Sequence, residues 1–414
     1  MMQLRLYLTA ETPLSFRDGV DLVTSELNRY VPGTAMLGAL AEAHQRLRGN
    51  PQEFARFFLE DRVVFGNAYP ATFEAESLTR SEQLPVAPIP ATARSGKRFG
   101  GFRFDGQHAR DRRDGVTDGL VPMALFALSG ESRADLLEPT RRLRRDTVEV
   151  DLDRISGFYR QGLQLDEIGK ARLSPDLRTR TGINYRTGTV QQEILYSTQV
   201  LPERSVFWGC WTIADDEAEG EQLRDRLEIF VEDLVESGML RLGNNRTRGF
   251  GRVQARLMEY AGDTAAALAE RVRRFQQLLG EAARQHQIDL PAGVYVPITL
   301  TSDALLYDDL LRSRLRLAPG DLAAHGILDS ELVYHTAGVR RVRGWNTLLG
   351  LPRADMAAIS MGAVFLFRLP AAFADWPALL RLQQAGLGLR RAEGYGAISI
   401  ADRFHLDSAG GRLR

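Results

Sequence analysis

The residues best suited to chemistry lie in a stretch rich in glycine and arginine, GNNRTRGFGR, at 243–252. The candidate binding residues in this stretch are Asn244, Asn245, Arg246, Arg248, Gly249, Gly251 and Arg252. Glycine allows positive φ and lacks the Cβ that would keep another group away, so such a loop can place its N–H groups against a phosphate. A guanidinium offers a planar fork of donors that matches phosphate oxygens. We therefore predict that this stretch contacts the backbone of a nucleic acid.

A second stretch of the same type, GLGLRRAEGYG, lies at 386–396. Neither stretch is a P-loop, because no Gly-Lys-Ser/Thr is present and each precedes a predicted strand instead of opening a helix. The alternative for both is a bulge with the aromatic residue in the core, and we expect Phe250 and Tyr395 to be core residues. The second stretch repeats an arginine pair, but its Glu393 would repel phosphate. The first stretch is therefore expected to be the principal contact.

The sequence contains six histidines, which are candidate acid–base catalysts. Metal-independent RNA cleavage needs a base for the 2′-hydroxyl and an acid for the leaving oxygen, work suited to histidine. His44 lies in a predicted helix at a phase that predicts a half-buried surface side chain. His335 precedes AGVRRVRGW (337–345), but no second His or Tyr is placed beside it by spacing. We expect a non-catalytic protein and keep an endoribonuclease as the alternative.

No metal or cofactor is expected. The single cysteine, Cys210, excludes an intramolecular disulfide and a multi-cysteine zinc site. The surrounding VFWGCWTI predicts a small buried residue in a strand. Adjacent acids such as Asp308 and Asp309 have no metal-binding spacing, and no nucleotide-binding motif is present.

The composition is that of a folded protein, with 44% hydrophobic and 26% charged residues among 414. No apolar run approaches the ~18 residues of a membrane helix, and the start, MMQLRLYLTAETPL, has no export pattern, so the cytoplasm is the expected location. The net charge is zero, but 51 of the 53 basic residues are arginine. They cluster at 94–103, 178–186, 246–252 and 340–345. Local arginine patches on a neutral protein favour nucleic-acid binding along one face and protein contacts elsewhere.

The two loops end two similar sets of predicted elements. Residues 205–257 read as strand, amphipathic helix, loop and strand, and residues 363–402 repeat that order in a shorter span. Each half also opens with a candidate edge strand, at 4–10 and 294–308. The repeat predicts an α+β fold of two ferredoxin-like (RRM-like) modules, each an antiparallel sheet with helices on one face and the other face open.

A predicted helix from about Thr264 to Gln287 separates the two halves, with Asp263 or Thr264 as its N-cap and Pro291 as its stop. The predicted boundaries are 1–260 for the N-terminal module, 261–290 for the linker helix and 291–414 for the C-terminal module, with an insertion at about 80–175 in the first module.

Four segments resemble the RAMP (repeat-associated mysterious protein) superfamily of CRISPR systems. The first is the Gly-rich loop before the final strand, and YVPGTAMLGAL (30–40) is similar to a helix-start stretch of the family. RTRTGINYRTGTVQQEILYSTQVLPERSVFWGCWTI (178–213) resembles a segment of effector-complex subunits. PVAPIPATARSGKRFGGF (85–102) resembles the double-module subunit of type III-D systems. The resemblance implies cysteines after the T-A-R-S stretch and before the L-E-P element, which would form a small zinc site. Here Gly96 takes the first place and ESRADLLEP (131–139) contains no cysteine, so this zinc site is expected to be lost.

The resemblance implies an RNA-binding subunit of a type III antiviral effector complex that holds the 5′ repeat-derived handle of the CRISPR RNA. Its implied partners are that guide RNA, the large polymerase-like subunit and the backbone RAMP subunits. Beyond the first loop, the implied RNA contacts are Arg178, Arg180, Arg186, Arg94, Lys97 and Arg98. A metal-independent endoribonuclease that processes CRISPR precursor RNA and a purely protein-binding scaffold remain the alternatives.

Overall fold

The computed structural model describes residues 1–17, 27–71, 86–102, 115–129, 133–145, 148–160, 169–170, 173–183, 190–213, 217–346 and 351–407. The chain divides into two compact units, each mixing helices with antiparallel sheets, so the α+β class is confirmed. The first unit is Met1–Glu74, Arg172–Tyr260 and Arg343–Asp355; the second is Ala75–Ala171, Ala261–Val342 and Met356–Arg414. The segment predicted as an insertion thus belongs, by its contacts, to the second unit.

The first unit is built on a four-stranded antiparallel sheet with the order β13-β1-β12-β2. Its strands are β1 (Met2–Ala10), β2 (Val63–Pro70), β12 (Val206–Ile213) and β13 (Val253–Glu259). In β1, Leu6 pairs with Gly209 of β12 and with Leu257 of β13. The prediction of an edge strand here is therefore wrong. The apolar alternation of a strand is the same in a central and an edge position, and only its pairing partners distinguish them.

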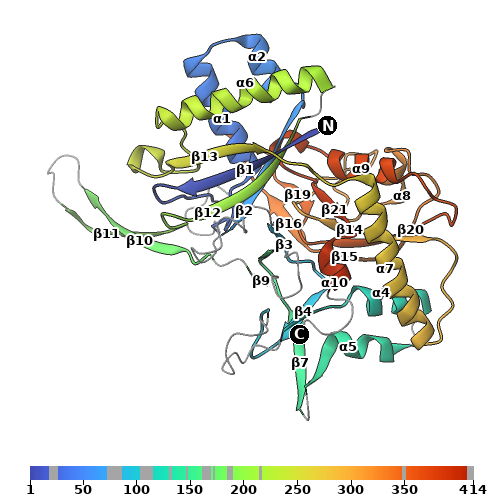
Figure 1. Ribbon diagram of the computed structural model, residues 1–414. Coiled ribbons are helices and arrows are strands. Elements are labelled where there is room, and N and C mark those ends of the chain that lie inside the picture. The colour runs from blue at the N-terminus through green and yellow to red at the C-terminus, as the bar shows by residue number, and fades with distance from the viewer. Residues whose placement is uncertain are drawn as a thin grey trace. The chain divides into compact units, whose positions relative to one another are not determined.

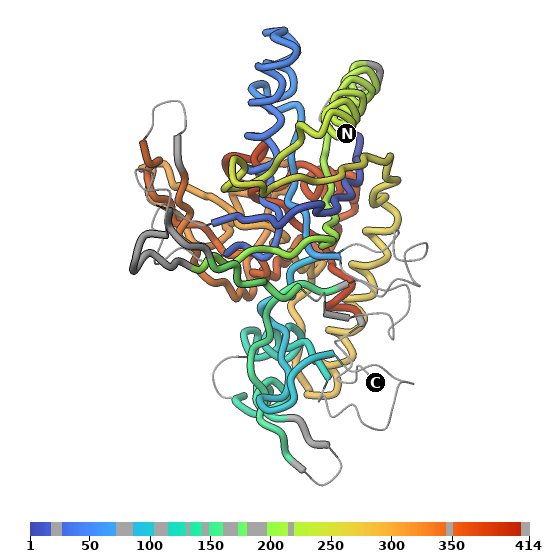
Figure 2. Tube along the Cα trace, turned by 90° about the vertical axis from the view of Figure 1, so that its left-hand side faces the viewer, coloured from blue at the N-terminus to red at the C-terminus, as the bar shows by residue number. Residues whose placement is uncertain are grey.

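Helices α1 (Gly33–Leu47), α2 (Pro51–Phe58) and α6 (Glu217–Glu236) lie on one face of this sheet (Figures 1 and 2). The core that they share with the strands includes Leu4, Leu6 and Leu8 of β1, Phe207 and Trp211 of β12, and Leu227, Phe230 and Leu234 of α6. On the opposite face, Arg5, Trp208 and Thr212 are only 8%, 4% and 8% exposed. This face is therefore not open at these positions, contrary to expectation. Cys210 lies in β12 as predicted, but its side chain is exposed.

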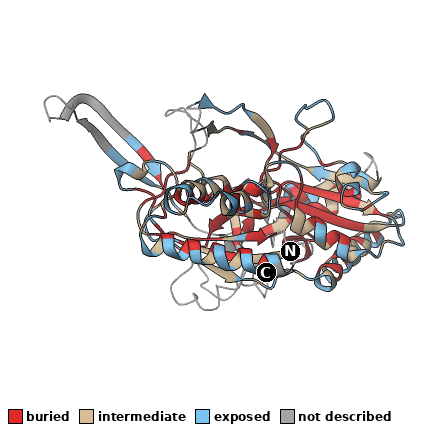
Figure 3. Cartoon of the chain, turned by 90° about the horizontal axis from the view of Figure 1, so that it is seen from above, coloured by how far each residue is buried: buried red, intermediate tan, exposed pale blue. Residues whose placement is uncertain are grey.

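A long hairpin also belongs to the first unit. Strands β10 (Asp176–Ile183) and β11 (Val190–Val200) pair with each other and, within the described chain, with no other strand. The hairpin extends away from the four-stranded sheet of its unit, in which most residues of β1, β2 and β12 are buried (Figure 3). Arg178 and Leu177 near its base are exposed.

The second unit contains a four-stranded antiparallel sheet with the order β15-β20-β14-β21. Its strands are β14 (Val294–Leu300), β15 (Glu331–Thr336), β20 (Val364–Leu369) and β21 (Ile398–Ile400). Strand β14 lies between β20 and β21, so this second predicted edge strand is also central.

Both faces of the second sheet are covered. Leu379 and Leu382 of α9 (Trp376–Ala385) pack in one core with Ile298 and Phe365. The other face carries Tyr295, Val364 and Leu366, which pack with α4 (Leu120–Ser129) and with the second half of α7. Helix α7 (Ala265–Gln285) is the predicted long helix, and Thr264 caps it by accepting a hydrogen bond from the Ala267 amide at 3.1 Å. The helix and its Thr264 cap are confirmed.

Buried polar pairs join the segment 86–170 to the end of the chain. His405 of α10 (Arg403–Asp407) contacts Asp118 through Nδ1 and Thr299 through Nε2, each at 2.8 Å. The Tyr159 hydroxyl donates to Asp402. Since all these side chains except Asp118 (7%) are 2% exposed or less, the pairs hold this segment firmly against the second sheet.

The remaining elements are short. In the second unit they are β3 (Val86–Pro88), β4 (Ala93–Gly96), β5 (Val116–Asp118), η2 (Ala134–Leu137), α5 (Glu138–Arg141), β6 (Arg142–Arg145), β7 (Val148–Arg154), β8 (Phe158–Arg160), β9 (Gly169–Lys170), α8 (Pro319–Ala323), β16 (Val339–Val342) and β19 (Met356–Ile359). The first unit adds the pair β17 (Trp345–Asn346) and β18 (Leu351–Pro352). Within the described chain, every helix is too short or too polar to cross a membrane.

Candidate functional site

The two Gly/Arg loops follow the same backbone path. We call residues 243–252 the first loop and 386–396 the second loop. The first loop has positive φ at Gly243 (78°), Asn245 (60°), Gly249 (85°) and Gly251 (93°). The second has positive φ at Gly388 (80°), Arg390 (57°), Gly394 (88°) and Gly396 (71°), so every such position of the first loop recurs at the same spacing, and the second loop adds Gly386 (64°). Each loop encloses one short turn of 3₁₀ helix, η4 (Arg246–Arg248) or η5 (Arg391–Glu393), and then leads to a strand.

Matching hydrogen bonds hold the two loops. In the first loop the Leu242 amide donates to Gly251 O at 2.8 Å, and the Asn244 amide donates to Ser15 O at 2.8 Å. In the second loop the Leu387 amide donates to Gly396 O at 2.8 Å, and the Leu389 amide donates to Leu305 O at 2.9 Å. Each loop is therefore held both between its own two ends and against the segment that follows the first strand of its four-stranded sheet, β1 or β14.

Glycine is required at two positions of the first loop. A Cβ on Gly243 would lie 2.5 Å from Ser15 O, and a Cβ on Gly251 would lie 2.5 Å from Leu242 O. Phe250, between the last two glycines, is only 6% exposed, which confirms it as a core residue. Asn244, Thr247 and Arg248 are exposed. The loop is thus a rigid backbone that turns its polar side chains outward.

Two arginines of the first loop form ion pairs within the first unit. Arg246 Nη1 lies 2.8 Å from Glu42 Oε2 of α1. Arg252 Nε lies 2.6 Å from Glu11 Oε2, while Gln254 donates to the other Glu11 oxygen at 2.6 Å. Both guanidinium groups keep substantial exposure, 40% for Arg246 and 48% for Arg252. The carboxylates therefore orient these cations without removing them from solvent. Sequence reasoning missed both glutamates, because nothing in the local pattern places them near the loop.

The second loop uses its arginines internally. Arg390 makes a two-pronged pair with Glu393, with Nε 2.9 Å from Oε1, and its guanidinium carbon lies 5.1 Å from the centre of the Tyr395 ring. Burial works to lower the pKa of Arg390, but the pair with Glu393 outweighs it and the net pKa is raised. Burial also raises the pKa of Tyr395 to about 12. Arg391 donates to Gly386 O at 3.2 Å. Glu393 occupies the place that Arg248 has in the first loop, so the second loop carries an anion where the first carries a cation.

The other predicted contacts are dispersed. Arg178 of β10 is 47% exposed and lies 3.8 Å from Glu203 and 3.9 Å from Asp176. The Arg180 backbone pairs with Tyr196 in the hairpin, while its side chain lies outside the described residues, as does all of Arg186.

Arg94, Lys97 and Arg98 belong to the second unit. Arg94 Nη1 donates to Ala91 O at 2.9 Å and to Ala93 O at 3.0 Å, and burial lowers its pKa. This guanidinium therefore supports the backbone of its own unit. Lys97 and Arg98 follow on an exposed turn.

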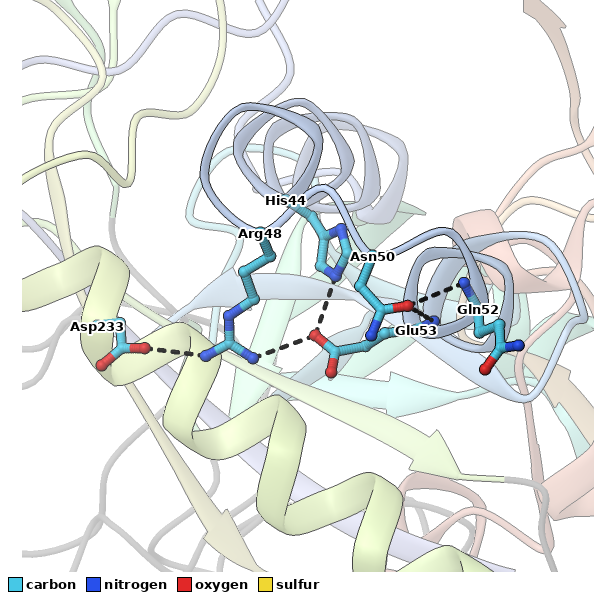
Figure 4. Close-up of polar contacts among 6 residues, drawn as sticks. All are labelled: His44, Arg48, Asn50, Gln52, Glu53 and Asp233. Atoms are coloured by element: carbon cyan, nitrogen blue, oxygen red, sulfur yellow. Dashed lines mark hydrogen bonds and ion pairs between the residues drawn. The ribbon is translucent and has the colours of Figure 1, made fainter.

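His44 is fully buried, so the expectation of a half-buried surface side chain is wrong. Its Nε2 lies 3.0 Å from Glu53 Oε1 of α2, and Arg48 Nη1 donates to the same oxygen at 3.1 Å (Figure 4). Arg48 also donates to Asp233 of α6 at 2.9 Å. Burial works to raise the pKa of Glu53, but the hydrogen bonds with His44 and Arg48 outweigh it and the net pKa is lowered.

Aromatic rings close over His44. The rings of Phe54, Phe57, Phe58 and Phe230 all lie 5.4–6.0 Å from the imidazole, centre to centre. Three of these come from α2, which folds back across α1. The spacing of apolar residues within α1 could not predict this burial of His44, because the phenylalanines that cover it come from other helices. The imidazole is out of reach of a 2′-hydroxyl in this conformation.

His335 is exposed on β15, where its ring stacks on Phe365 at 5.9 Å with an angle of 6° between the planes. Within the described part of the chain it has no charged or hydrogen-bonding side-chain partner, and no cluster of three His, Cys, Asp or Glu side chains could hold a metal ion. His335 thus has no described side-chain partner for acid–base chemistry, whereas His44 has Glu53 but is enclosed by phenylalanine rings.

Comparisons with known proteins assign the chain to a family. No curated protein matches it. Among solved structures it is similar to a chain of the type III-B Cmr-beta complex bound to cognate target RNA and AMPPnP, at 12% identity and a TM-score of 0.35, over 87% of this chain and 86% of that one. A chain of a type IV-B CRISPR complex is similar at 9% identity and a TM-score of 0.27, over 64% and 93%. The model of the RAMP superfamily matches residues 7–254, which include the first loop. The chain belongs to the RAMP superfamily.

Proposed function

We propose that the chain is a cytoplasmic, RNA-binding subunit of a CRISPR effector complex, and that the first loop is its principal contact with the guide RNA. The observation that carries the proposal is the contrast between the two loops. On one shared backbone path, the first loop presents Arg246, which stays 40% exposed beside Glu42, and the exposed Arg248, whereas the second pairs the less exposed Arg390 with Glu393. A phosphate would meet exposed arginines at the first loop and the anion of Glu393 at the second.

Two ferredoxin-like modules are part of this proposal. Numbered along the chain within each unit, the strands of both sheets have the spatial order 4-1-3-2 and are antiparallel. In both units a helical segment follows the first strand, and a second helix leads through the Gly/Arg loop to the fourth. This is the arrangement of a ferredoxin-like or RRM-like module. The matching hydrogen bonds of the loops support the same duplication.

The sheet of the second module is poorly suited to RNA binding, because α9 covers one of its faces and α4 and α7 cover the other. RNA contacts are therefore assigned to the first module, with its hairpin β10–β11 and Arg178 as further candidates. The resemblance of residues 85–102 and 178–213 to the type III-D double-module subunit favours the 5′ repeat-derived handle as the bound part of the guide. It also favours the large polymerase-like subunit and the backbone RAMP subunits as neighbours.

The test is a binding series with repeat-derived RNA at several salt concentrations. Arg246→Ala with Arg248→Ala is expected to weaken binding of every RNA sequence and to lower the salt slope by about 1.4, since each phosphate contact on a single strand contributes about 0.7. Arg390→Ala with Arg391→Ala is the matched control and is expected to change neither. Unchanged affinity of the first double variant at low salt would remove the loop from the site.

The endoribonuclease alternative finds no support at His44, whose imidazole is enclosed by phenylalanines. Incubation of the purified chain with repeat RNA and a chelator tests it directly, with His44→Ala and His335→Ala as controls. Cleavage that either substitution abolishes would replace the proposed function. A purely protein-binding scaffold would be indicated if RNA crosslinks mapped to neither Gly/Arg loop.

A further inference from the structure

One carboxylate of the first unit lies between two arginines. Glu42 of α1 contacts Arg46 Nη2 through Oε1 and Arg246 Nη1 through Oε2, each at 2.8 Å. Arg46 is four residues beyond Glu42 on the same helix, whereas Arg246 comes from the first loop, 204 positions away. Because both oxygens belong to one carboxylate, the two guanidinium groups are close neighbours.

The charge of this trio is unbalanced. Two guanidinium groups share one carboxylate, so one positive charge remains. The side chains of Arg46 and Arg246 are 69% and 40% exposed, and among the described residues neither makes a further side-chain ion pair. Each arginine uses one terminal nitrogen for Glu42 and retains other donors. Such donors are suited to two-pronged bonds with phosphate oxygens.

The next arginine, at the C-cap of this helix, differs. Arg48 is 26% exposed and divides its donors between Glu53 and Asp233. A phosphate at Arg48 would have to displace two carboxylates, one of them hydrogen-bonded to a buried histidine. Exposure and remaining donors therefore distinguish Arg46 from Arg48, although the sequence presents both as arginines near the end of α1.

We infer that Arg46 is an RNA-binding residue of the same surface as the first loop, and that Glu42 is a positioning residue that holds Arg46 and Arg246 side by side. This inference rests on the proposed function and extends it from the loop to α1. The ligand is the backbone of single-stranded RNA, and the paired guanidinium groups contact neighbouring phosphates. The contact carries no base specificity, since it is made to phosphates only.

The first experiment measures the affinity and salt slope for repeat-derived RNA with Arg46→Ala, Arg46→Lys and Arg56→Ala. Arg56 is an exposed arginine of α2 in the same unit and is the matched control. Arg46→Ala is expected to weaken binding about three- to tenfold at low salt and to lower the slope by about 0.7, the contribution of one phosphate contact. Arg46→Lys keeps the charge, and its RNA affinity is expected to lie between those of Arg46→Ala and the unaltered protein. Arg56→Ala is expected to have no effect.

The outcomes separate the two proposals. If Arg46→Ala binds like the unaltered protein while the Arg246/Arg248 variant is impaired, the inference about Arg46 is overturned and the proposed function stands. If both bind normally, the first loop is removed from the site and the inference about Arg46 is overturned with it. If Arg56→Ala is as impaired as Arg46→Ala, the effect is one of net charge and the inference is also overturned.

The role of Glu42 needs a different measurement. In a double-mutant cycle, Arg46→Ala and Arg246→Ala are expected to be non-additive in RNA affinity, because loss of one arginine leaves the Glu42 charge to the other. In a Glu42→Gln background the two effects are expected to become additive. Non-additivity that persists unchanged in that background would overturn the positioning role, and a thermal melt of Glu42→Gln establishes that the variant is folded.

Discussion

Replacing Gly251 by alanine is expected to disrupt the first loop, whereas replacing Gly249, two positions earlier, is expected to add backbone strain alone. Both glycines have positive φ, 93° and 85°. Forcing an L residue into such a conformation costs about 1–2 kcal/mol. Around Gly249 a new Cβ would meet nothing within 4 Å. The expected destabilisation by Gly249→Ala is therefore about 1–2 kcal/mol.

At Gly251 the same strain is joined by a collision. The new Cβ would lie 2.5 Å from Leu242 O and 3.2 Å from Leu242 N, so the loop must move. That movement breaks the hydrogen bond from the Leu242 amide to Gly251 O (2.8 Å) and the one from the Gly251 amide to Pro13 O (3.0 Å). Each is worth about 1 kcal/mol. Gly251→Ala is therefore expected to cost about 3–4 kcal/mol in total.

Thermal unfolding of the two variants, followed by circular dichroism, measures the difference. About 2 kcal/mol corresponds to roughly 4–8 °C in Tm for a unit of 150–250 residues. Gly251→Ala should therefore melt that much below Gly249→Ala, and it should lose RNA affinity more severely. Equal Tm values for the two variants would refute the argument from crowding and leave backbone strain as the sole contribution.

Two further predictions concern pH. Because the net pKa of Glu53 lies below its ordinary value of 4.5, the stability that its carboxylate contributes is present above that pH and is lost as the pH falls through the folded-state pKa. The Tm gap between the unaltered protein and Glu53→Gln should therefore shrink below about pH 4.5, and a gap that widens in acid would contradict this. Burial works to lower the pKa of His405, but the interaction with Asp118 outweighs it, and the net pKa is raised above 6.5. The stability that the His405–Asp118 pair contributes is therefore present below pH 6.5 and is lost as the pH rises through the folded-state pKa. Asp118→Asn should therefore destabilise the second unit more at pH 6 than at pH 9, measured by hydrogen exchange of α10, and an equal loss at both values would count against the charged pair.

Local pattern determined much of this protein. The periodicity of α7 and its Thr264 cap follow from residues within a few positions of one another. The glycine spacing of the two loops recurs in their φ values, because positive φ is a property of single residues. Phe250 could be placed in the core from its position between two glycines. The family resemblance rested on short segments in order, which the chain itself displays.

Pairings between distant segments were decided by the tertiary structure alone. The alternation in β1 could not distinguish a central from an edge strand, because β12 and β13 lie more than 190 positions away. His44 is buried by α2 and α6, and the segment 86–170 is joined to α10 by His405 and Tyr159. Arg46 shares Glu42 with Arg246, which lies 204 positions from Glu42 along the chain. In each case the energy lies in contacts between residues far apart along the chain, and local spacing carries no information about which partners meet.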